Sequence, residues 1–150
     1  MSPIEIPNTL LIETIEHLKS SVERERVVLW LGRRHEATIQ ICEVFLPMQE
    51  TSADYFRIPA KSMSDIFAKL RAGRLMIAAQ VHTHPNEAFH SAADDHWAIV
   101  RHRGAVSIVV PDFCQRTSAH TFTRDALTFQ LDEHDQFTQV DASSAYTVTP

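Results

Sequence analysis

The chain has 150 residues, 44% of them hydrophobic, and carries a formal net charge of −5 at pH 7. Such a length is typical of one domain with its own core, so we expect a single domain over residues 1–150. The acidic balance argues against a nucleic-acid surface, and three glycines are too few for the phosphate-binding loops of nucleotide-binding folds.

Targeting and redox features predict a soluble, cytoplasmic protein. The N-terminal segment has no basic region ahead of its apolar stretch, unlike a signal peptide, and no apolar run reaches the roughly eighteen residues of a membrane helix. Cys42 and Cys114 form no C-x-x-C pair, and two thiols cannot build an all-cysteine zinc site. We expect both to be reduced core residues, with a disulfide as the open alternative.

The first half of the chain predicts one helix followed by two strands. Asn8 is a favourable N-cap, and the apolar residues after it recur with helical spacing. A continuously apolar run then stops at Gly32, which is typical of a buried strand, and Pro47 ends a second strand. The expected elements are a helix over 8–22, strands over 27–31 and 38–46, and a polar loop over 48–60 with extended structure near 55–58.

The second half predicts an alternation of helices and strands. Ser62 or Ser64 can cap a helix that stops at Gly73, and Ser91 can cap another that brings Trp97 and Val100 inward. The remaining elements are strands over 75–84 and 105–110, weaker strands over 119–124 and 127–132, and a tail from about residue 139 that we expect to be disordered. The predicted fold class is α/β, with a mixed β-sheet flanked by helices.

The segment from His82 to Asp94 contains the residues that point to chemistry. Side chains alternate along a strand, so His82 and His84 project from the same face at the end of the 75–84 strand. Ser91 caps the next helix, which puts Asp94 in its first turn. Two imidazoles and one carboxylate suit a single zinc ion and leave a fourth position for water, as in catalytic zinc sites.

Simpler interpretations exist for each half of this pattern. An isolated His-x-His is common in a chain with nine histidines, and Ser-x-x-Asp alone is more often a helix cap. Their succession on a strand, a loop and a helix is much less expected by accident. The nearby His90, His96 and His102 have no assigned catalytic role; we expect them to be exposed, and hydrogen bonding that supports the metal ligands is the alternative.

These residues resemble the JAMM (JAB1/MPN/Mov34) metalloprotease motif, in which a glutamate precedes His-x-His-Pro and then Ser-x-x-Asp. His82 to Pro85 and Ser91 to Asp94 match its second part. Glu25 and Gly32 keep the separation of the first and last residues in the strand pattern that carries the glutamate, although Val28 replaces the middle glycine of that pattern. The resemblance implies the JAB/MPN fold, which is similar to that of cytidine deaminases. It also implies one Zn²⁺, with Glu25 as general base towards zinc-bound water and Ser91 as a hydrogen-bond donor to the oxyanion.

Departures from the family pattern leave two choices open. The loop after Pro85 is one residue short, so counting from His84 selects Asp95 as third ligand, whereas counting from Ser91 selects Asp94. We prefer Asp94 because it shares a helical turn with Ser91. Glu25 could instead be a solvent-exposed charge in the run from Glu23 to Arg26, and Glu23 and Glu43 are then the candidates for the base.

JAMM enzymes mostly cleave after the C-terminus of ubiquitin or a ubiquitin-like protein. The resemblance to compact prokaryotic members therefore implies a deubiquitinase-like isopeptidase or peptidase. Its partners would be ubiquitin-like proteins, their conjugates and E1/E2-like proteins of the same pathway. The alternatives are an inactive MPN scaffold and a zinc hydrolase of small molecules or free peptides. A deaminase is disfavoured because its Cys-x-x-Cys ligand pair is absent.

Overall fold

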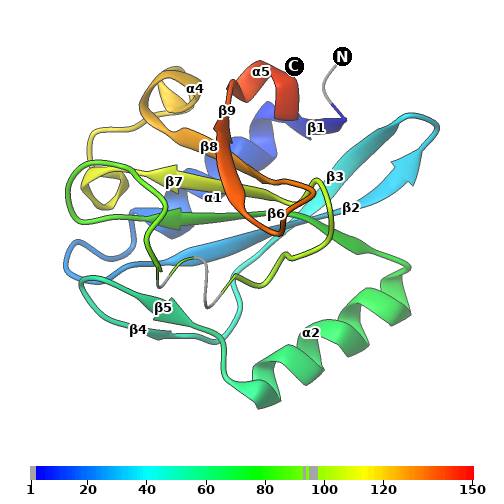
Figure 1. Ribbon diagram of the computed structural model, residues 1–150, viewed down its shortest axis with the longest axis horizontal. Helices are drawn as coiled ribbons and strands as arrows, with labels where there is room; N and C mark the ends of the chain where they lie inside the picture. Colours follow the sequence, from blue (N-terminus) through cyan, green and yellow to red (C-terminus); the bar gives the residue numbers. More distant parts are fainter. Residues whose placement is uncertain (1–2, 93, 95–97) are drawn as a thin grey trace.

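The computed structural model describes residues 3–92, 94 and 98–150. The described residues form an eight-stranded mixed sheet in the order β10-β1-β3-β2-β6-β7-β8-β9 and a small β4-β5 sheet, which confirms the predicted α/β class (Figure 1). The elements are β1 Ile4–Pro7, α1 Asn8–Leu18, β2 Val27–His35, β3 Thr38–Phe45, β4 Glu50–Thr51, β5 Phe56–Arg57, α2 Ala60–Gly73, β6 Met76–Thr83, β7 Val106–Val110, η1 Asp112–Cys114, α4 Phe122–Asp125, β8 Leu127–Leu131, β9 Phe137–Val140, α5 Ala142–Ala145 and β10 Tyr146–Thr149.

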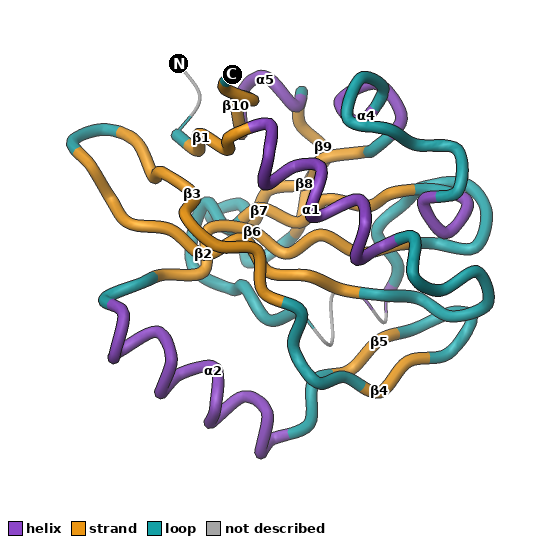
Figure 2. Tube along the Cα trace, turned by 180° about the vertical axis from the view of Figure 1, so that it is seen from behind, coloured by secondary structure: helices purple, strands orange, loops and turns teal. Residues whose placement is uncertain are grey.

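Helices α1 and α2 cover opposite faces of the central sheet, as the view from behind also shows (Figure 2). The strict alternation of side chains along β2 explains this arrangement. Val28 and Trp30 belong to the core cluster under α1, whereas Val27 and Leu29 pack with Ile66 of α2. Because both faces of β2 are covered, the apolar run that predicted this strand is continuous rather than alternating.

The helix boundaries differ from those expected. Pro7 occupies the N-cap position of α1, so the prediction of Asn8 as the cap is wrong, and the helix ends at Leu18. Helix α2 begins after Pro59, ahead of both serines proposed as caps. The left-handed residue that ends α2 is Arg74, one position beyond Gly73. Pro7 and Pro59 determine where the two helices start, because the fixed φ of proline suits the residue before a helix.

The C-terminal expectations need correction. Residues 122–125 form helix α4, so the strand predicted over 119–124 is wrong. The tail is ordered: β10 runs parallel to β1, with Ile4 opposite Tyr146. The buried Tyr146 ring packs edge-on against Trp30 at 5.5 Å between centroids. A four-residue strand whose partner lies at the other end of the chain has no local signal, which is why both β1 and β10 were missed.

Both cysteines are free thiols. Cys114 is buried as predicted, and burial raises the pKa of its thiol to about 11. Cys42 is exposed, so its prediction as a core residue is wrong. Separately, none of the helices in the described part of the chain is long and apolar enough to cross a membrane.

Gly32 lies at an irregularity in the β2-β3 register, where the two backbones approach closely. A Cβ atom at this position would lie only 2.4 Å from the carbonyl oxygen of Gln40. We therefore expect Gly32→Ala to lower the free energy of unfolding by about 1–3 kcal/mol, measured by urea denaturation. Gly73→Ala is the control, because its Cβ would meet only the flexible Leu75 side chain. An equal loss in the two variants would contradict the close-approach explanation.

Candidate active site

The two histidines of the predicted motif lie at the end of β6. This strand pairs with β2 on one side and with β7 on the other. His82 is on β6 and His84 follows its last residue, and both side chains are almost fully buried. Their ring centroids are 5.3 Å apart, and the Phe56 ring of β5 packs against His82 at 4.9 Å. The prediction that the two imidazoles share one face is therefore confirmed.

Asp94 completes the cluster from the segment that follows. Its Oδ2 atom lies 3.0 Å from Nε2 of His84 and 3.1 Å from Nε2 of His82. Ser91 and Asp94 also bond reciprocally: Ser91 N donates to Asp94 Oδ2 at 2.8 Å, and Asp94 N donates to Ser91 Oγ at 3.0 Å. This is the cap geometry expected from the Ser-x-x-Asp spacing, and it leaves the Ser91 hydroxyl proton able to point elsewhere.

The helix expected to continue to Arg101 does not do so, because residues 98–101 are not helical. Val100 is buried, as predicted. Trp97, His96 and Asp95 lie outside the described residues, so only Asp94 of the two candidate aspartates is placed at the site.

Opposing effects of burial and of neighbouring groups set the pKa of Asp94. Its burial acts to raise the pKa, but the positive charge of His82 and hydrogen bonds from His84 and the Ser91 backbone outweigh burial and hold it below the usual range. The carboxylate is therefore ionised, the form in which it can bind a cation.

His82, His84 and Asp94 fit a divalent metal ion. Each offers one ligand atom, and these atoms all lie within 4.8 Å of one another. Among the described residues, the buried atoms His82 Nε2 and Asp94 Oδ1 have no hydrogen-bond partner, which is costly unless another group satisfies them. Tetrahedral zinc with ligand distances of about 2.1 Å separates its ligand atoms by about 3.4 Å, close to the spacing of each imidazole from the carboxylate.

The β2-β6 pairing places Glu25 beside this cluster. Val27 is opposite His82, so continuing the antiparallel register puts Glu25 opposite His84. Two further bonds hold the strand ends together, from Thr83 N to Arg26 O at 3.0 Å and from Arg26 N to Thr83 Oγ1 at 2.9 Å. As a result, Glu25 Oε1 lies 3.8 Å from His84 Nε2.

Glu25 is 1% exposed, which argues against its alternative interpretation as a surface charge. Burial, followed by the charges of Asp94 and Asp54, raises the pKa of Glu25 to about 8. A divalent cation nearby would favour its ionised form. Of the alternatives, Glu23 is exposed and Glu43 pairs with Lys69 at 2.8 Å, so neither side chain replaces Glu25.

The turn after β7 holds the backbone of the ligand loop. Phe113 N donates to His84 O at 2.7 Å, and Asp112 N donates to Asn86 O at 2.9 Å. Asp112, Phe113 and Cys114 all have positive φ angles, between 50° and 63°, although none is glycine. Non-glycine residues are held in this region only where surrounding contacts require it. Sequence reasoning missed this clamp because no turn motif marks it.

His90 was expected to be exposed but is half-buried beside the site. Its Nε2 bonds to Ser107 Oγ at 3.1 Å, and Ser107 Oγ also accepts a bond from Gln80 Nε2 at 3.1 Å. The imidazole packs against Phe129 and Phe137. Because Gln80 and Ser107 are fully buried on neighbouring strands, this network ties the residue before Ser91 to the sheet.

Removing the Ser107 hydroxyl deprives Gln80 and His90 of a shared partner in a buried location. We expect Ser107→Ala to lower the free energy of unfolding by about 1–3 kcal/mol. Ser64→Ala, at an exposed position on α2, is the matched control and should change the free energy of unfolding by less than about 0.5 kcal/mol. Chemical denaturation of both variants tests this, and equal stabilities would show that the network contributes nothing.

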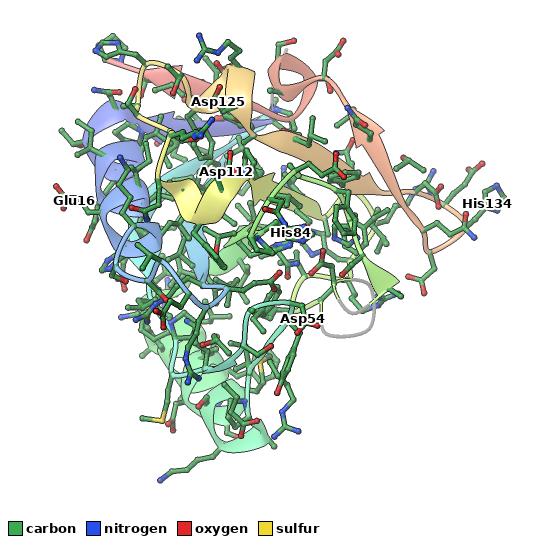
Figure 3. All side chains as sticks on the ribbon, turned by 90° about the vertical axis from the view of Figure 1, so that its left-hand side faces the viewer. Glu16, Asp54, His84, Asp112, Asp125 and His134 are labelled. Carbon is green, nitrogen blue, oxygen red and sulfur yellow. The ribbon has the colours of Figure 1, made fainter. Side chains whose placement is uncertain are left out.

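A cavity of about 240 Å³ opens beside the cluster. Glu25, His84 and Ser91 line it, and the exposed Asp54, from the turn between β4 and β5, forms part of its rim. Figure 3 marks His84 and Asp54. His82 and Asp94, the other two predicted metal ligands, are buried and are not among the residues that line the cavity. The site therefore combines a buried candidate metal cluster with a carboxylate and a hydroxyl that face a substrate-sized space.

Comparisons with known proteins agree with this geometry. Residues 7–139 match the family described as prokaryotic homologs of the JAB domain. A probable metalloprotease of Sinorhizobium fredii is 28% identical over 118 residues, which cover 75% of this chain and 73% of that protein. The solution structure of a Desulfitobacterium hafniense protein covers 97% of this chain and 92% of its own, with a TM-score of 0.68 and 14% identity.

At that identity the solved structure supports the fold alone, and it does so over nearly the whole chain. The metalloprotease relative and the His82–His84–Asp94 cluster support a metal-dependent hydrolase. Since the family match spans most of the chain, the protein belongs to the prokaryotic JAB-domain family.

Proposed function

We propose that this protein is a zinc-dependent peptidase or isopeptidase that cleaves after the C-terminus of a ubiquitin-like protein. The observation that carries the proposal is the buried Glu25 carboxylate, 3.8 Å from a histidine of the candidate metal cluster and facing the same cavity as Ser91. In this proposal His82, His84 and Asp94 hold the metal. The two free cysteines suit the reducing cytoplasm as the location.

Zinc, when bound, supplies Lewis-acid activation of water and of the scissile carbonyl. Glu25 takes the proton from the attacking water and then delivers it to the leaving amine. The Ser91 hydroxyl, whose oxygen is fixed by Asp94 N, donates a hydrogen bond to the oxyanion of the tetrahedral intermediate. Pro85 and Phe89 add apolar surface to the lining of the same cavity.

The β4-β5 hairpin supports a substrate that enters as an extended tail. Phe56 of this hairpin contacts the His82 ring, and Asp54 in its turn lines the cavity. An extended C-terminal tail can add to such an edge through main-chain hydrogen bonds.

The test uses the zinc-loaded protein with ubiquitin and prokaryotic ubiquitin-like proteins, each fused through its Gly-Gly tail to a fluorescent reporter. Matched fusions in which a proline replaces the last glycine are the controls. We expect cleavage only after the intact tail. Cleavage of free peptides but of no fusion would favour a general peptidase, and a chain that binds no zinc and cleaves nothing would favour the scaffold.

A further inference from the structure

Two exposed carboxylates form part of the rim of the cavity that Glu25 lines. Asp54 and Glu87 are exposed carboxylates that line the cavity together with Glu25, and among its described lining residues there is no lysine or arginine. Inside this rim, Glu25 Oε2 is buried and has no hydrogen-bond partner among the described residues. The exposed Asp54 and Glu87 therefore give the mouth of the cavity a negative charge that no lysine or arginine among the lining residues that the structure describes offsets.

Asp54 is held close to Glu25 by the backbone. Glu25 N donates to Ser52 O at 2.7 Å, and this bond holds the turn between β4 and β5 against the segment that leads into β2. The Asp54 carboxylate accepts a bond from the Ser52 hydroxyl at 2.9 Å and so keeps its orientation in this turn.

The role of Glu25 identifies which part of the substrate meets this rim. Glu25 passes its proton to the leaving amine, so groups beside Glu25 face the residues that follow the scissile bond. A carboxylate rim attracts positive charge there and repels negative charge.

We propose that Asp54 and Glu87 select substrates with a lysine or arginine next to the leaving amine. This inference rests on the proposed peptidase function but concerns the opposite side of the scissile bond from the ubiquitin-like tail. The substrate class that this rim would favour is a basic peptide or a lysine-rich segment of a target protein.

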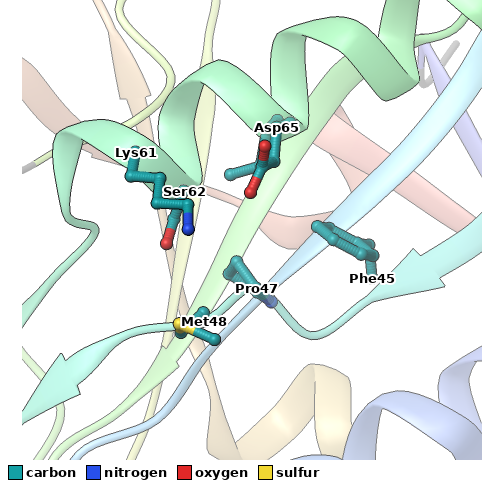
Figure 4. Close-up of a pocket in the computed structure, with 7 residues that line it drawn as sticks. Phe45, Pro47, Met48, Lys61, Ser62 and Asp65 are labelled. Carbon is teal, nitrogen blue, oxygen red and sulfur yellow. The ribbon is translucent and has the colours of Figure 1, made fainter.

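The first arm of the test compares fusions that differ only in the residue after the tail, which is lysine, alanine or glutamate. We expect kcat/KM for lysine to exceed that for glutamate by about tenfold at low salt, and Asp54→Asn or Glu87→Gln each to reduce that ratio about threefold. The preference should shrink in 0.5 M salt, which screens exposed charges. Asp65→Asn, in a separate hollow between β3 and α2, is the matched control and should leave the ratio unchanged (Figure 4).

The second arm measures binding without turnover. Lys-Ala-amide and Glu-Ala-amide, each with a free amine, are titrated into the zinc-free protein and followed by NMR. We expect several-fold tighter binding of the lysine dipeptide, lost in the Asp54→Asn, Glu87→Gln double variant. Equal cleavage and equal binding of the two series would overturn the rim proposal while leaving the peptidase intact. A binding preference without cleavage of any fusion would support the rim and reject the proposed function.

Discussion

Glu25→Gln is expected to retain zinc and to lower turnover by about a hundredfold or more, in line with the loss of a general base. The amide has almost the same shape as the carboxylate, so the 3.8 Å approach to His84 need not change. It cannot accept the proton of the attacking water. Elemental analysis and steady-state cleavage of the best fusion substrate measure the two quantities.

Glu23→Gln provides the matched control, because this neighbouring glutamate is exposed and does not line the cavity. Its turnover should remain within about twofold of the unchanged protein, as is usual for surface substitutions. If Glu25→Gln kept full activity while binding zinc, another group would have to be the base.

Asp94→Asn and His82→Ala are expected to abolish stoichiometric zinc binding and, with it, activity. His82→Ala removes one of the three atoms that face one another within 4.8 Å, and Asp94→Asn removes the negative charge of the carboxylate that supplies another. At a zinc concentration of 100 times Kd, binding stabilises the native chain by about 2.7 kcal/mol. For a chain of this size that corresponds to a rise in Tm of about 5–10 °C, which both variants should lack.

The zinc-dependent change in Tm is the better readout, since removing a buried side chain lowers stability by itself. Asp94→Asn keeps the side-chain volume and separates loss of metal from loss of packing. His102→Ala, at an exposed histidine, should keep the full shift. A zinc-induced rise in Tm that persisted in Asp94→Asn would exclude this carboxylate as the third ligand.

Local patterns in the sequence determined the central part of this protein. The continuous apolar run of β2 is a direct consequence of burial on two faces, so this strand could be predicted. The shared face of His82 and His84 could be predicted because successive side chains alternate between the faces of a strand. The Ser-x-x-Asp spacing likewise predicted the reciprocal bonds between Ser91 and Asp94, because they lie within one turn.

Only the tertiary structure decided what depends on residues distant in the chain. The β2-β6 register brings Glu25 to His84, the β1-β10 pairing orders the tail, and the bond from Glu25 N to Ser52 O brings Asp54 to the cavity. The Gln80–Ser107–His90 network also joins three separate segments. Short strands and lone polar residues carry weak local preferences, so their positions follow from the pairing and packing of the whole chain.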